Sequence, residues 1–276
     1  MQYSEDFFLG INNLKIYYQI FKPDNPKCVI QISHGFCEHS GRYKKLIDEL
    51  VANNFAVFIN DHQGHGKSEG IRNHTKSFDD YMEDVHTVTL MIKEIYPELP
   101  IFLIGHSMGS FVAQRYAIKY QEDIQGMILS GSGTRVKELP RFIKIMARVI
   151  AKILPTFKAD TGLDPDGISS DPESVDAYRN DPLIDYKIST AITGVCFMNH
   201  YKEIKDKIGL ISIPVLFQKG ELDDMILDIE AFMEELKTDD KQVIVYENAK
   251  HEVYTETKEK REKAFSDLVN WINSHI

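Results

Sequence analysis

The sequence is poor in the features that mark secreted, membrane-spanning and metal-binding proteins. Its three cysteines, Cys28, Cys37 and Cys196, are an odd number at wide spacing, without a CxxC pair. Such usage suits a reducing compartment better than a disulfide framework. No apolar run approaches the roughly 18 residues of a membrane helix, and the N-terminal segment has no basic stretch typical of a signal peptide. We therefore expect a cytoplasmic protein.

The sequence also contains fewer basic residues than acidic ones. The 32 Lys and Arg residues are outnumbered by 42 Asp and Glu residues, and the formal net charge is −10 at pH 7. A surface of that sign repels phosphates, so nucleic acid is not expected as a partner. The apolar share of 43% is ordinary for a globular protein, and 276 residues suit one sizeable core with an insertion. The sequence carries no signal for an oligomeric state.

Six short apolar runs recur along the chain, and helical patterns lie between them. Runs that are apolar on both faces are typical of parallel strands buried between helix layers. The alternation predicts an α/β fold with a mostly parallel sheet flanked by helices. Alternating residues around 14–20, closed by Pro23 and Pro26, predict an edge hairpin. The predicted strands are Cys28–Ile32, Ala56–Ile59, Ile101–Ile104, Gly126–Leu129, Pro214–Phe217 and Gln242–Tyr246, and the predicted helical faces lie within residues 43–51, 81–95 and 265–272.

Residues 134–203 break this alternation. They contain no convincing buried strand, and the segment is far longer than an ordinary connection between strands. We interpret residues 134–203 as a helical cap inserted into a core made of residues 1–133 and 204–276. The cap would cover the carboxyl ends of the strands, where open α/β sheets bind their ligands.

The most informative motif joins a predicted strand to a predicted helix. Gly-His-Ser-Met-Gly at residues 105–109 follows the strand Ile101–Ile104, and a helical pattern begins at Phe111. In a G-x-S-x-G elbow, side chains at both glycine positions would collide with neighbouring backbone, and the serine is held in a strained conformation with its Oγ exposed. Ser107 is therefore the candidate nucleophile. The alternative is an accidental Gly/Ser turn, which the flanking strand and helix disfavour.

A second turn with glycine follows the first buried strand. His34 and Gly35 come directly after this strand and let the backbone approach the same crevice with a free N–H group. Tetrahedral intermediates of acyl transfer need two such donors. We assign them to the backbone N–H groups of Phe36 and of Met108, the residue after the nucleophile. The alternative is that His34 is a structural histidine in an ordinary turn.

Candidates for an acid and a base follow later in the chain. The strand Pro214–Phe217 leads into Glu221, Asp223 and Asp224, and the last predicted strand leads into His251. His251 is the one histidine placed after a core strand and before the final helix, so we predict that it is the base. A carboxylate beyond the neighbouring strand would fix its tautomer and stabilise the imidazolium. Asp223, Asp224 and Glu221 are all candidates for this acid.

Together these segments resemble the monoacylglycerol lipase and lysophospholipase branch of the α/β-hydrolases. The resemblance covers nearly the whole chain in the family's order. It implies Ser107, Asp223 and His251 as the catalytic triad, because the family's acid stands three residues after the glycine at position 220. It also implies the same two oxyanion donors and a mobile, lipid-binding cap. The matching stretches are residues 34–43, 61–70, 105–109 and 180–183, Gly220 with Asp223, and Tyr246–His251.

Two positions depart from the family pattern. Cys37 stands where the family usually has glycine, and Ser110 stands where it has alanine or glycine. Cys37 lies next to the proposed oxyanion donor Phe36. We therefore expect it to affect the preference for acyl groups more than the chemistry.

A histidine-rich loop offers an apparent metal site. Asp61, His62 and His65 are residue types that bind metals. In the resembling family, however, this loop has a structural role beside the nucleophile elbow. We therefore expect neither a metal nor a cofactor.

The predicted cap contains an amphipathic helix. A basic amphipathic helix in an acidic chain suggests peripheral contact with anionic lipid. The alternative, which we favour, is a cap helix packed on the sheet with an ordinary solvated face. Both interpretations place apolar side chains above Ser107. The apolar stripe is Leu139, Phe142, Ile143, Met146, Ile150, Ile153 and Leu154, of which Phe142, Ile143, Met146 and Ile150 are predicted to bind substrate, and the basic residues are Arg141, Lys144, Arg148 and Lys152.

These observations predict a serine hydrolase that cleaves carboxylic esters through an acyl-enzyme on Ser107. Monoacylglycerols, lysophospholipids or similar acyl esters of medium to long chain are the expected substrates. An aminopeptidase or amidase is the alternative on the same fold, and Glu38 or cap aspartates would then have to receive an amino terminus. A non-catalytic binding protein is a further hypothesis, since fold does not determine function.

Overall fold

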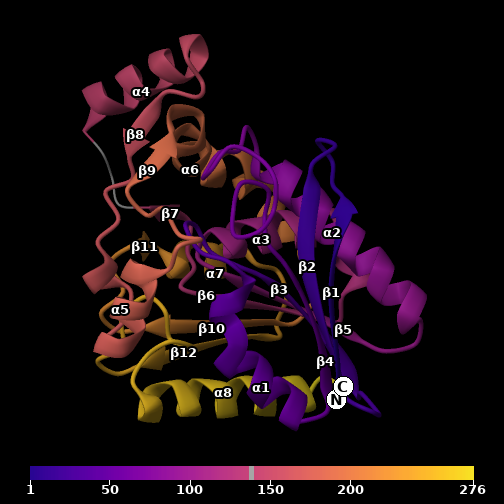
Figure 1. The fold of residues 1–276 in the computed structure, drawn as a ribbon. Helices are drawn as coiled ribbons and strands as arrows, with labels where there is room; N and C mark the ends of the chain where they lie inside the picture. Colours follow the sequence, from indigo (N-terminus) through magenta and orange to yellow (C-terminus); the bar gives the residue numbers. More distant parts are fainter. Residues whose placement is uncertain (137–139) are drawn as a thin grey trace.

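An eight-stranded sheet forms the centre of the computed structural model, which describes residues 1–136 and 140–276 (Figure 1). Its strands are β1 (Gln2–Leu9), β2 (Lys15–Lys22), β3 (Cys28–Ser33), β4 (Phe55–Asn60), β5 (Ile101–His106), β6 (Gly126–Ser130), β10 (Val215–Gly220) and β12 (Lys241–Tyr246). They are arranged in the order β1-β2-β4-β3-β5-β6-β10-β12. From β4 to β12 all neighbours are parallel, whereas β2 is antiparallel to both β1 and β4. The predicted α/β fold and its edge hairpin are confirmed.

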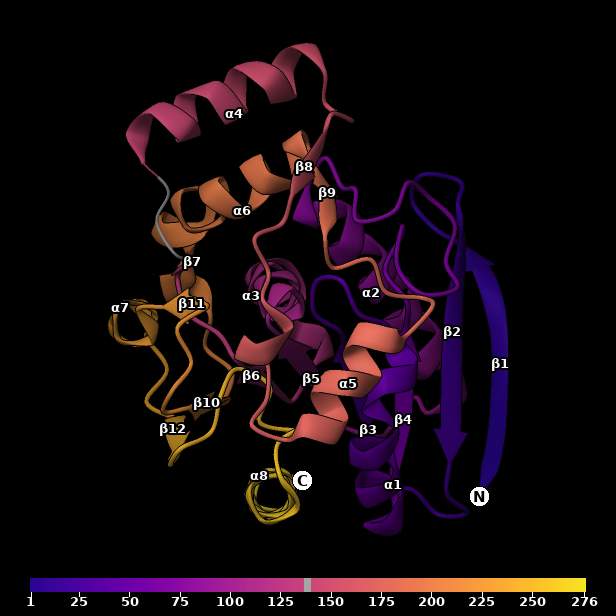
Figure 2. The same ribbon diagram turned by 60° about the vertical axis from the view of Figure 1, so that its left-hand side comes forward.

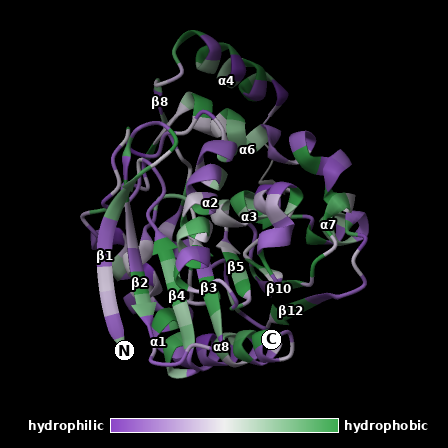
Figure 3. Ribbon diagram, turned by 90° about the vertical axis from the view of Figure 1, so that its right-hand side faces the viewer, coloured by the Kyte–Doolittle hydropathy of each residue, from purple (hydrophilic) through white to green (hydrophobic). Residues whose placement is uncertain are grey.

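Helices cover both faces of this sheet (Figure 2). On one face lie α1 (Lys44–Ala52) and α8 (Lys258–Asn273), and on the other lie α2 (Phe78–Ile95), α3 (Met108–Tyr120) and α7 (Ile229–Glu235). Successive side chains of a strand point to opposite faces, so each inner strand contributes to both layers. In β5, Leu103 packs with α2 and α3, while the ring of Phe102 lies 6.0 Å from that of Trp271 in α8. Figure 3 shows the resulting apolar interior along the central strands.

The last strand differs from the prediction. β12 lies at the edge of the sheet, with β10 as its neighbour, and Val243 and Val245 are 38% and 56% exposed. The sequence predicted a strand buried on both faces, and this is wrong for β12. An apolar run does not reveal whether a strand has one neighbour or two, because the strand order depends on contacts between distant segments.

The segment between β6 and β10 lies beyond the carboxyl ends of the parallel strands (Figure 1, Figure 2). It contains α4 (Arg141–Ile153), α5 (Pro172–Asn180) and α6 (Ala191–Ile204), together with the antiparallel pair β8 (Lys158–Asp160) and β9 (Ile188–Thr190). A second short pair, β7 (Arg135–Val136) and β11 (Ile226–Leu227), joins its beginning to the chain after β10. The division into a core and a cap of residues 134–203 stays a prediction.

The position of α4 contradicts the favoured interpretation of the cap helix. α4 packs against α6, which lies between α4 and the sheet (Figure 2), and Ala151 is the one buried residue of Arg141–Ile153. Periodicity reveals that a helix is amphipathic, but the neighbouring helix decides which face is covered. No helix in the described ranges is both long and apolar enough to cross a membrane. Of the predicted substrate-binding residues, Phe142, Ile143 and Met146 are exposed and Ile150 is half-buried, while Leu139 of the stripe lies outside the described residues.

Candidate active site

The candidate residues lie in loops at one edge of the sheet. Phe36 follows β3, Ser107 follows β5, Asp223 follows β10 and His251 follows β12. With β6, these strands are consecutive in the sheet and parallel. Their carboxyl ends therefore meet along one edge, and side chains that are far apart in the sequence come close in space.

Ser107 occupies a sharp turn between β5 and α3. Its φ of 52° and ψ of −118° lie outside the regions that residues with a Cβ usually adopt. A Cβ built on Gly105 would lie 2.4 Å from the carbonyl oxygen of Gly109, and one built on Gly109 would lie 2.0 Å from that of Ser33. The Ser107 N–H group donates to the Ser130 carbonyl at 2.9 Å, which ties the turn to β6. Both glycines are therefore required by the close approach of backbone, as the sequence predicted.

Two backbone N–H groups lie free beside this turn. Gly35 lies close to Ser107, because a Cβ built on Gly35 would be 3.2 Å from Cβ of Ser107. The next N–H group, that of Phe36, and the N–H group of Met108 at the start of α3 have no acceptor within residues 1–136 and 140–276. The ring of Phe36 packs 5.1 Å from that of Phe197 in α6. The predicted oxyanion donors must be N–H groups without a partner in the protein, and their role stays a prediction.

His251 is hydrogen bonded to one of the three candidate carboxylates. Its Nδ1 lies 2.9 Å from Oδ2 of Asp223, and the exposed fractions of the two side chains are 5% and 0%. The other oxygen of Asp223 accepts the N–H group of Met225 at 3.0 Å. Glu221 and Asp224 lie at the surface. The structure therefore brings together the histidine and the acid that the resemblance implied, and their catalytic roles stay a prediction.

The charges around His251 favour its protonated form. Burial by itself lowers the pKa of His251, but the charge and hydrogen bond of Asp223, with smaller contributions from Glu252 and Glu38, raise it above the usual range. Burial alone would raise the pKa of Asp223, and the interaction with His251 lowers it instead. A base that must carry a positive charge in the transition state needs this kind of support.

Sequence reasoning missed a glycine that makes room for the imidazole. Gly131, directly after β6, has a φ of 54°, and a Cβ on it would lie 2.8 Å from Cε1 of His251. The rings of His251 and His106 lie 5.1 Å apart, which places the imidazole beside the elbow. Ser107 Oγ is not hydrogen bonded to His251 in the described chain, and such bonds often form only with substrate bound. The signal available in the sequence was a glycine directly after a predicted strand whose carboxyl end lies at this edge of the sheet.

The histidine-rich loop is held together by its own hydrogen bonds. The Asp61 carboxylate accepts the N–H groups of Ser40 at 2.7 Å and Lys67 at 2.8 Å. The His62 N–H group donates to Nε2 of His34 at 2.9 Å, and the two rings are 4.4 Å apart. Among residues 1–136 and 140–276, no three His, Cys, Asp or Glu side chains are placed to hold a metal ion. These contacts support a structural role for the loop.

The two departures from the family pattern both lie at the site. Cys37 has a φ of 54°, a conformation that suits glycine, and burial raises the pKa of its thiol. The Ser110 hydroxyl donates to the carbonyl oxygen of Ser107 at 2.6 Å. Ser110 therefore adds a hydrogen bond to the turn that carries Ser107, which alanine or glycine would not make.

Known proteins resemble this chain over nearly its whole length. The model of the family described as serine aminopeptidase, S33 matches residues 24–258. A monoacylglycerol lipase of Mycolicibacterium smegmatis is 29% identical over 99% of this chain and 98% of its own. The monoglyceride lipase of Homo sapiens is 30% identical over 94% of this chain and 86% of its own. The crystal structure of Paleococcus ferrophilus monoacylglycerol lipase has a TM-score of 0.85 and 31% identity, over 95% of this chain and 99% of that one.

Proposed function

This chain belongs to the serine aminopeptidase S33 family of α/β-hydrolases, on the branch of the monoglyceride lipases, and from that premise we propose that it hydrolyses monoacylglycerols or related acyl esters, lysophospholipids included, through an acyl-enzyme on Ser107. Its similarity to monoacylglycerol lipases indicates that it is an enzyme that acts on esters. The observation that carries the proposal is the buried pair of His251 and Asp223, 2.9 Å apart, at the sheet edge where Ser107 occupies a strained turn.

In the proposed acylation step, neutral His251 removes the proton from Ser107 Oγ as this oxygen attacks the ester carbonyl. Negative charge develops on the carbonyl oxygen, which accepts hydrogen bonds from the N–H groups of Phe36 and Met108. Each such donor contributes about 2.7–4 kcal/mol in characterised enzymes. Asp223 stabilises the imidazolium of His251, which then gives its proton to the leaving alcohol.

In the proposed deacylation step, the same groups act on water. His251 removes a proton from a water molecule that attacks the acyl group on Ser107, and the two N–H donors again hold the oxyanion. The imidazolium returns the proton to Ser107 Oγ as the fatty acid leaves. The net reaction consumes water and requires no cofactor.

Amide hydrolysis is a second candidate, because the family description names an aminopeptidase. An aminopeptidase needs a carboxylate free to receive an amino terminus near the nucleophile. Glu38, however, accepts hydrogen bonds from Arg42 at 2.6 Å and Tyr43 at 2.7 Å. Asp181 of the inserted segment is bonded to His39 at 3.0 Å. These pairings favour the ester.

We further propose that residues 134–203 act as a cap whose helix α4 rests on an anionic lipid surface. The outward face of α4 is apolar, with Phe142 64% and Ile153 70% exposed, and basic residues of the same helix adjoin this face. An amphipathic helix of this kind lies in a membrane interface, where each basic residue near the surface contributes about 1 kcal/mol. The three cysteines are unpaired thiols, which fits a cytoplasmic location. The exposed apolar residues of α4 are Phe142, Ile143, Ile145, Met146, Val149 and Ile153.

Active-site labelling and a substrate series test the proposed function. A fluorophosphonate probe should label the protein, and Ser107→Ala should abolish both labelling and hydrolysis, with a rate loss on the order of 10⁴–10⁶. Ser4→Ala is the matched control, because Ser4 is exposed in the edge strand β1, and it should leave labelling and hydrolysis unchanged. Monoacylglycerols, lysophospholipids, aminoacyl amides and p-nitrophenyl esters of increasing chain length form the substrate series. Best activity on acetate with none beyond butyrate would exclude the lipid substrates.

A further inference from the structure

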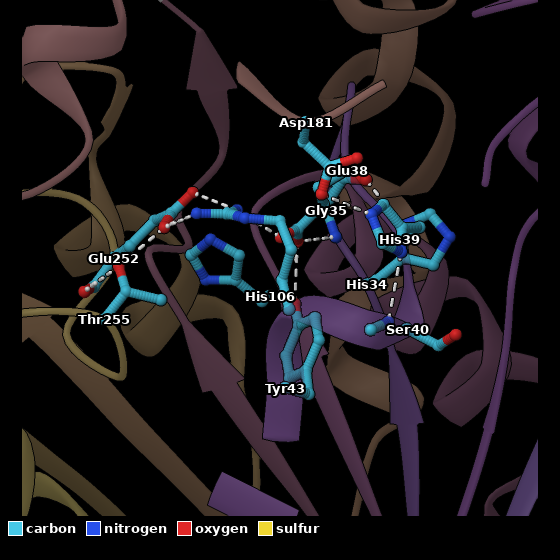
Figure 4. Close-up of polar contacts among 12 residues, drawn as sticks. His34, Gly35, Glu38, His39, Ser40, Tyr43, His106, Asp181, Glu252 and Thr255 are labelled. Atoms are coloured by element: carbon cyan, nitrogen blue, oxygen red, sulfur yellow. Dashed lines mark hydrogen bonds and ion pairs between the residues drawn. The ribbon is translucent and has the colours of Figure 1, made fainter. Parts of the chain in front are cut away.

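A buried arginine contacts the two loops that carry the candidate catalytic groups. The Arg42 side chain is 9% exposed, and its Nη1 donates to Oε2 of Glu38 at 2.6 Å. Both terminal nitrogens also donate to the two oxygens of Glu252, at 2.8 and 2.7 Å. Glu38 and Glu252 are 4% and 8% exposed, and Figure 4 shows the hydrogen bonds that surround them. One guanidinium thus bridges two buried carboxylates.

Glu38 connects the arginine to the oxyanion loop. Its Oε1 accepts the hydroxyl group of Tyr43 at 2.7 Å and the backbone N–H group of Gly35 (Figure 4). Gly35 lies against Ser107 and directly precedes Phe36, one of the proposed oxyanion donors. The Gly35 N–H group belongs to the peptide directly before the one that carries the Phe36 N–H group, so the carboxylate that Arg42 holds fixes the backbone next to that donor.

Glu252 connects the arginine to the histidine loop. It directly follows His251, and it accepts the hydroxyl group of Thr255 at 2.7 Å. Its backbone N–H group donates to the carbonyl oxygen of Ile168, in the segment between β6 and β10, at 2.8 Å. Cζ of Arg42 also lies 4.6 Å from the centre of the Tyr178 ring in α5. The same side chain therefore contacts the inserted segment as well as the two loops.

Stability alone does not explain this cluster. Removing two carboxylates and a guanidinium from water is costly, and apolar residues of similar size are often equally stable or more so. A guanidinium differs from apolar residues, and from lysine, in that its planar fork fixes the direction of several acceptors at once. The cluster also carries a net negative charge close to His251, which favours a positive charge on that ring.

We propose that Arg42 is a positioning residue for the reaction: through Glu38 and Glu252 it holds the oxyanion loop and the histidine loop at the correct distance and orientation. This inference rests on the proposed function. Arg42 does not touch the reacting atoms, and its effect on the reaction passes through the peptide before Phe36 and through the residue after His251. Glu252 adds negative charge that stabilises the imidazolium.

Two variants and one control test the proposal. Arg42→Lys keeps the charge but lacks the planar fork, and Glu252→Gln keeps the shape but removes one negative charge. Lys44→Met is the control, since the ion pair of Lys44 with Asp48 is exposed. For each protein, kcat, KM and the pH profile are measured on a short, water-soluble ester, well below the melting temperature. We expect Arg42→Lys to lower kcat by about 10²-fold, as misplacements near 1 Å do, with KM and the control nearly unchanged.

The pH profile separates positioning from mere loss of stability. His251 is faced by Asp223, Glu38, Glu252 and the ring of His106. Removing the charge of Glu252 should move the acidic limb of the kcat profile to lower pH, which a change in stability alone does not do. If Arg42→Lys does not fold, Glu252→Gln decides the question by this shift.

Two results would overturn the inference: a folded Arg42→Lys protein with the kcat of the unchanged enzyme, or a Glu252→Gln profile that does not move. Failure of the proposed function has a different signature. In that case the unchanged protein itself neither hydrolyses esters nor reacts with the fluorophosphonate probe at Ser107.

Discussion

A Cβ atom on Gly131 would lie 2.8 Å from Cε1 of His251 and 3.0 Å from its Nδ1. Gly131 follows β6 and His251 follows β12, so a strand without a candidate catalytic residue provides the space for the imidazole. The φ of Gly131, 54°, is a second reason for glycine at this position. The placement of His251, the candidate base, therefore depends on the absence of a side chain at position 131 as well as on Asp223.

Gly131→Ala should displace the imidazole of His251. We expect kcat/KM to fall by about 10²-fold, since the added methyl group forces a shift of the ring. The left-handed backbone adds about 1–2 kcal/mol of strain. Gly162→Ala is the matched control, because Gly162 also has a positive φ, 69°, but nothing lies within 4 Å of its added Cβ. Equal losses of activity in the two variants would show that the clash with His251 is not responsible.

Asp223→Asn, compared with Asp224→Asn, tests which of these adjacent aspartates is the acid that pairs with His251. The amide cannot stabilise the imidazolium of His251, and we expect kcat to fall by about 10⁴-fold. Asp224→Asn makes the same chemical change one residue away at the surface, and it should leave kcat nearly unchanged. Steady-state kinetics on one soluble ester compares the two. The acid assignment is wrong if Asp224→Asn loses the activity and Asp223→Asn keeps it.

The activity should rise with pH through the titration of His251. The reaction needs neutral imidazole, and Asp223, Glu252 and Glu38 raise the pKa of His251 above its usual 6.5. Activity is therefore low below that pKa, where the ring is protonated, and reaches a plateau above it. The midpoint of kcat/KM should lie above pH 6.5. A flat profile between about pH 5 and 9 would contradict the assignment of His251 as base.

The outward face of α4 should bind anionic vesicles. Burial of an apolar side chain of this size contributes about 1.5–3 kcal/mol, so Phe142→Ser combined with Val149→Ser should weaken binding at least about tenfold. Leu90→Ser is the control, since Leu90 is 48% exposed on α2. Co-sedimentation with vesicles of phosphatidylcholine and phosphatidylglycerol measures the binding, and salt should weaken it. Equal binding of the double variant and the control would refute lipid docking through this face.

Local pattern was enough to predict most of the fold and the sharp turn that carries Ser107. The strand Ile101–His106, the glycines on either side of Ser107 and the helix that follows are neighbours in the sequence, and the close approach of Gly105 to Gly109 involves the same short turn. The order of strands, elbow and final histidine therefore predicted a parallel sheet with Ser107 and His251 at its edge. The periodicity of a helix or strand and the steric limits of a tight turn both act within a few residues. A sequence pattern therefore shows them directly.

Only the tertiary structure shows the features that depend on contacts between segments far apart in the sequence. Asp223 and Asp224 are adjacent in the sequence, and only the packing of two loops shows which of them contacts His251. The apolar face of α4 is outward because α6 occupies the other side. Arg42 and Glu252 are 210 positions apart, and no sequence pattern pairs them. Such contacts follow from where whole elements pack, and a period or a motif within one segment does not contain that information.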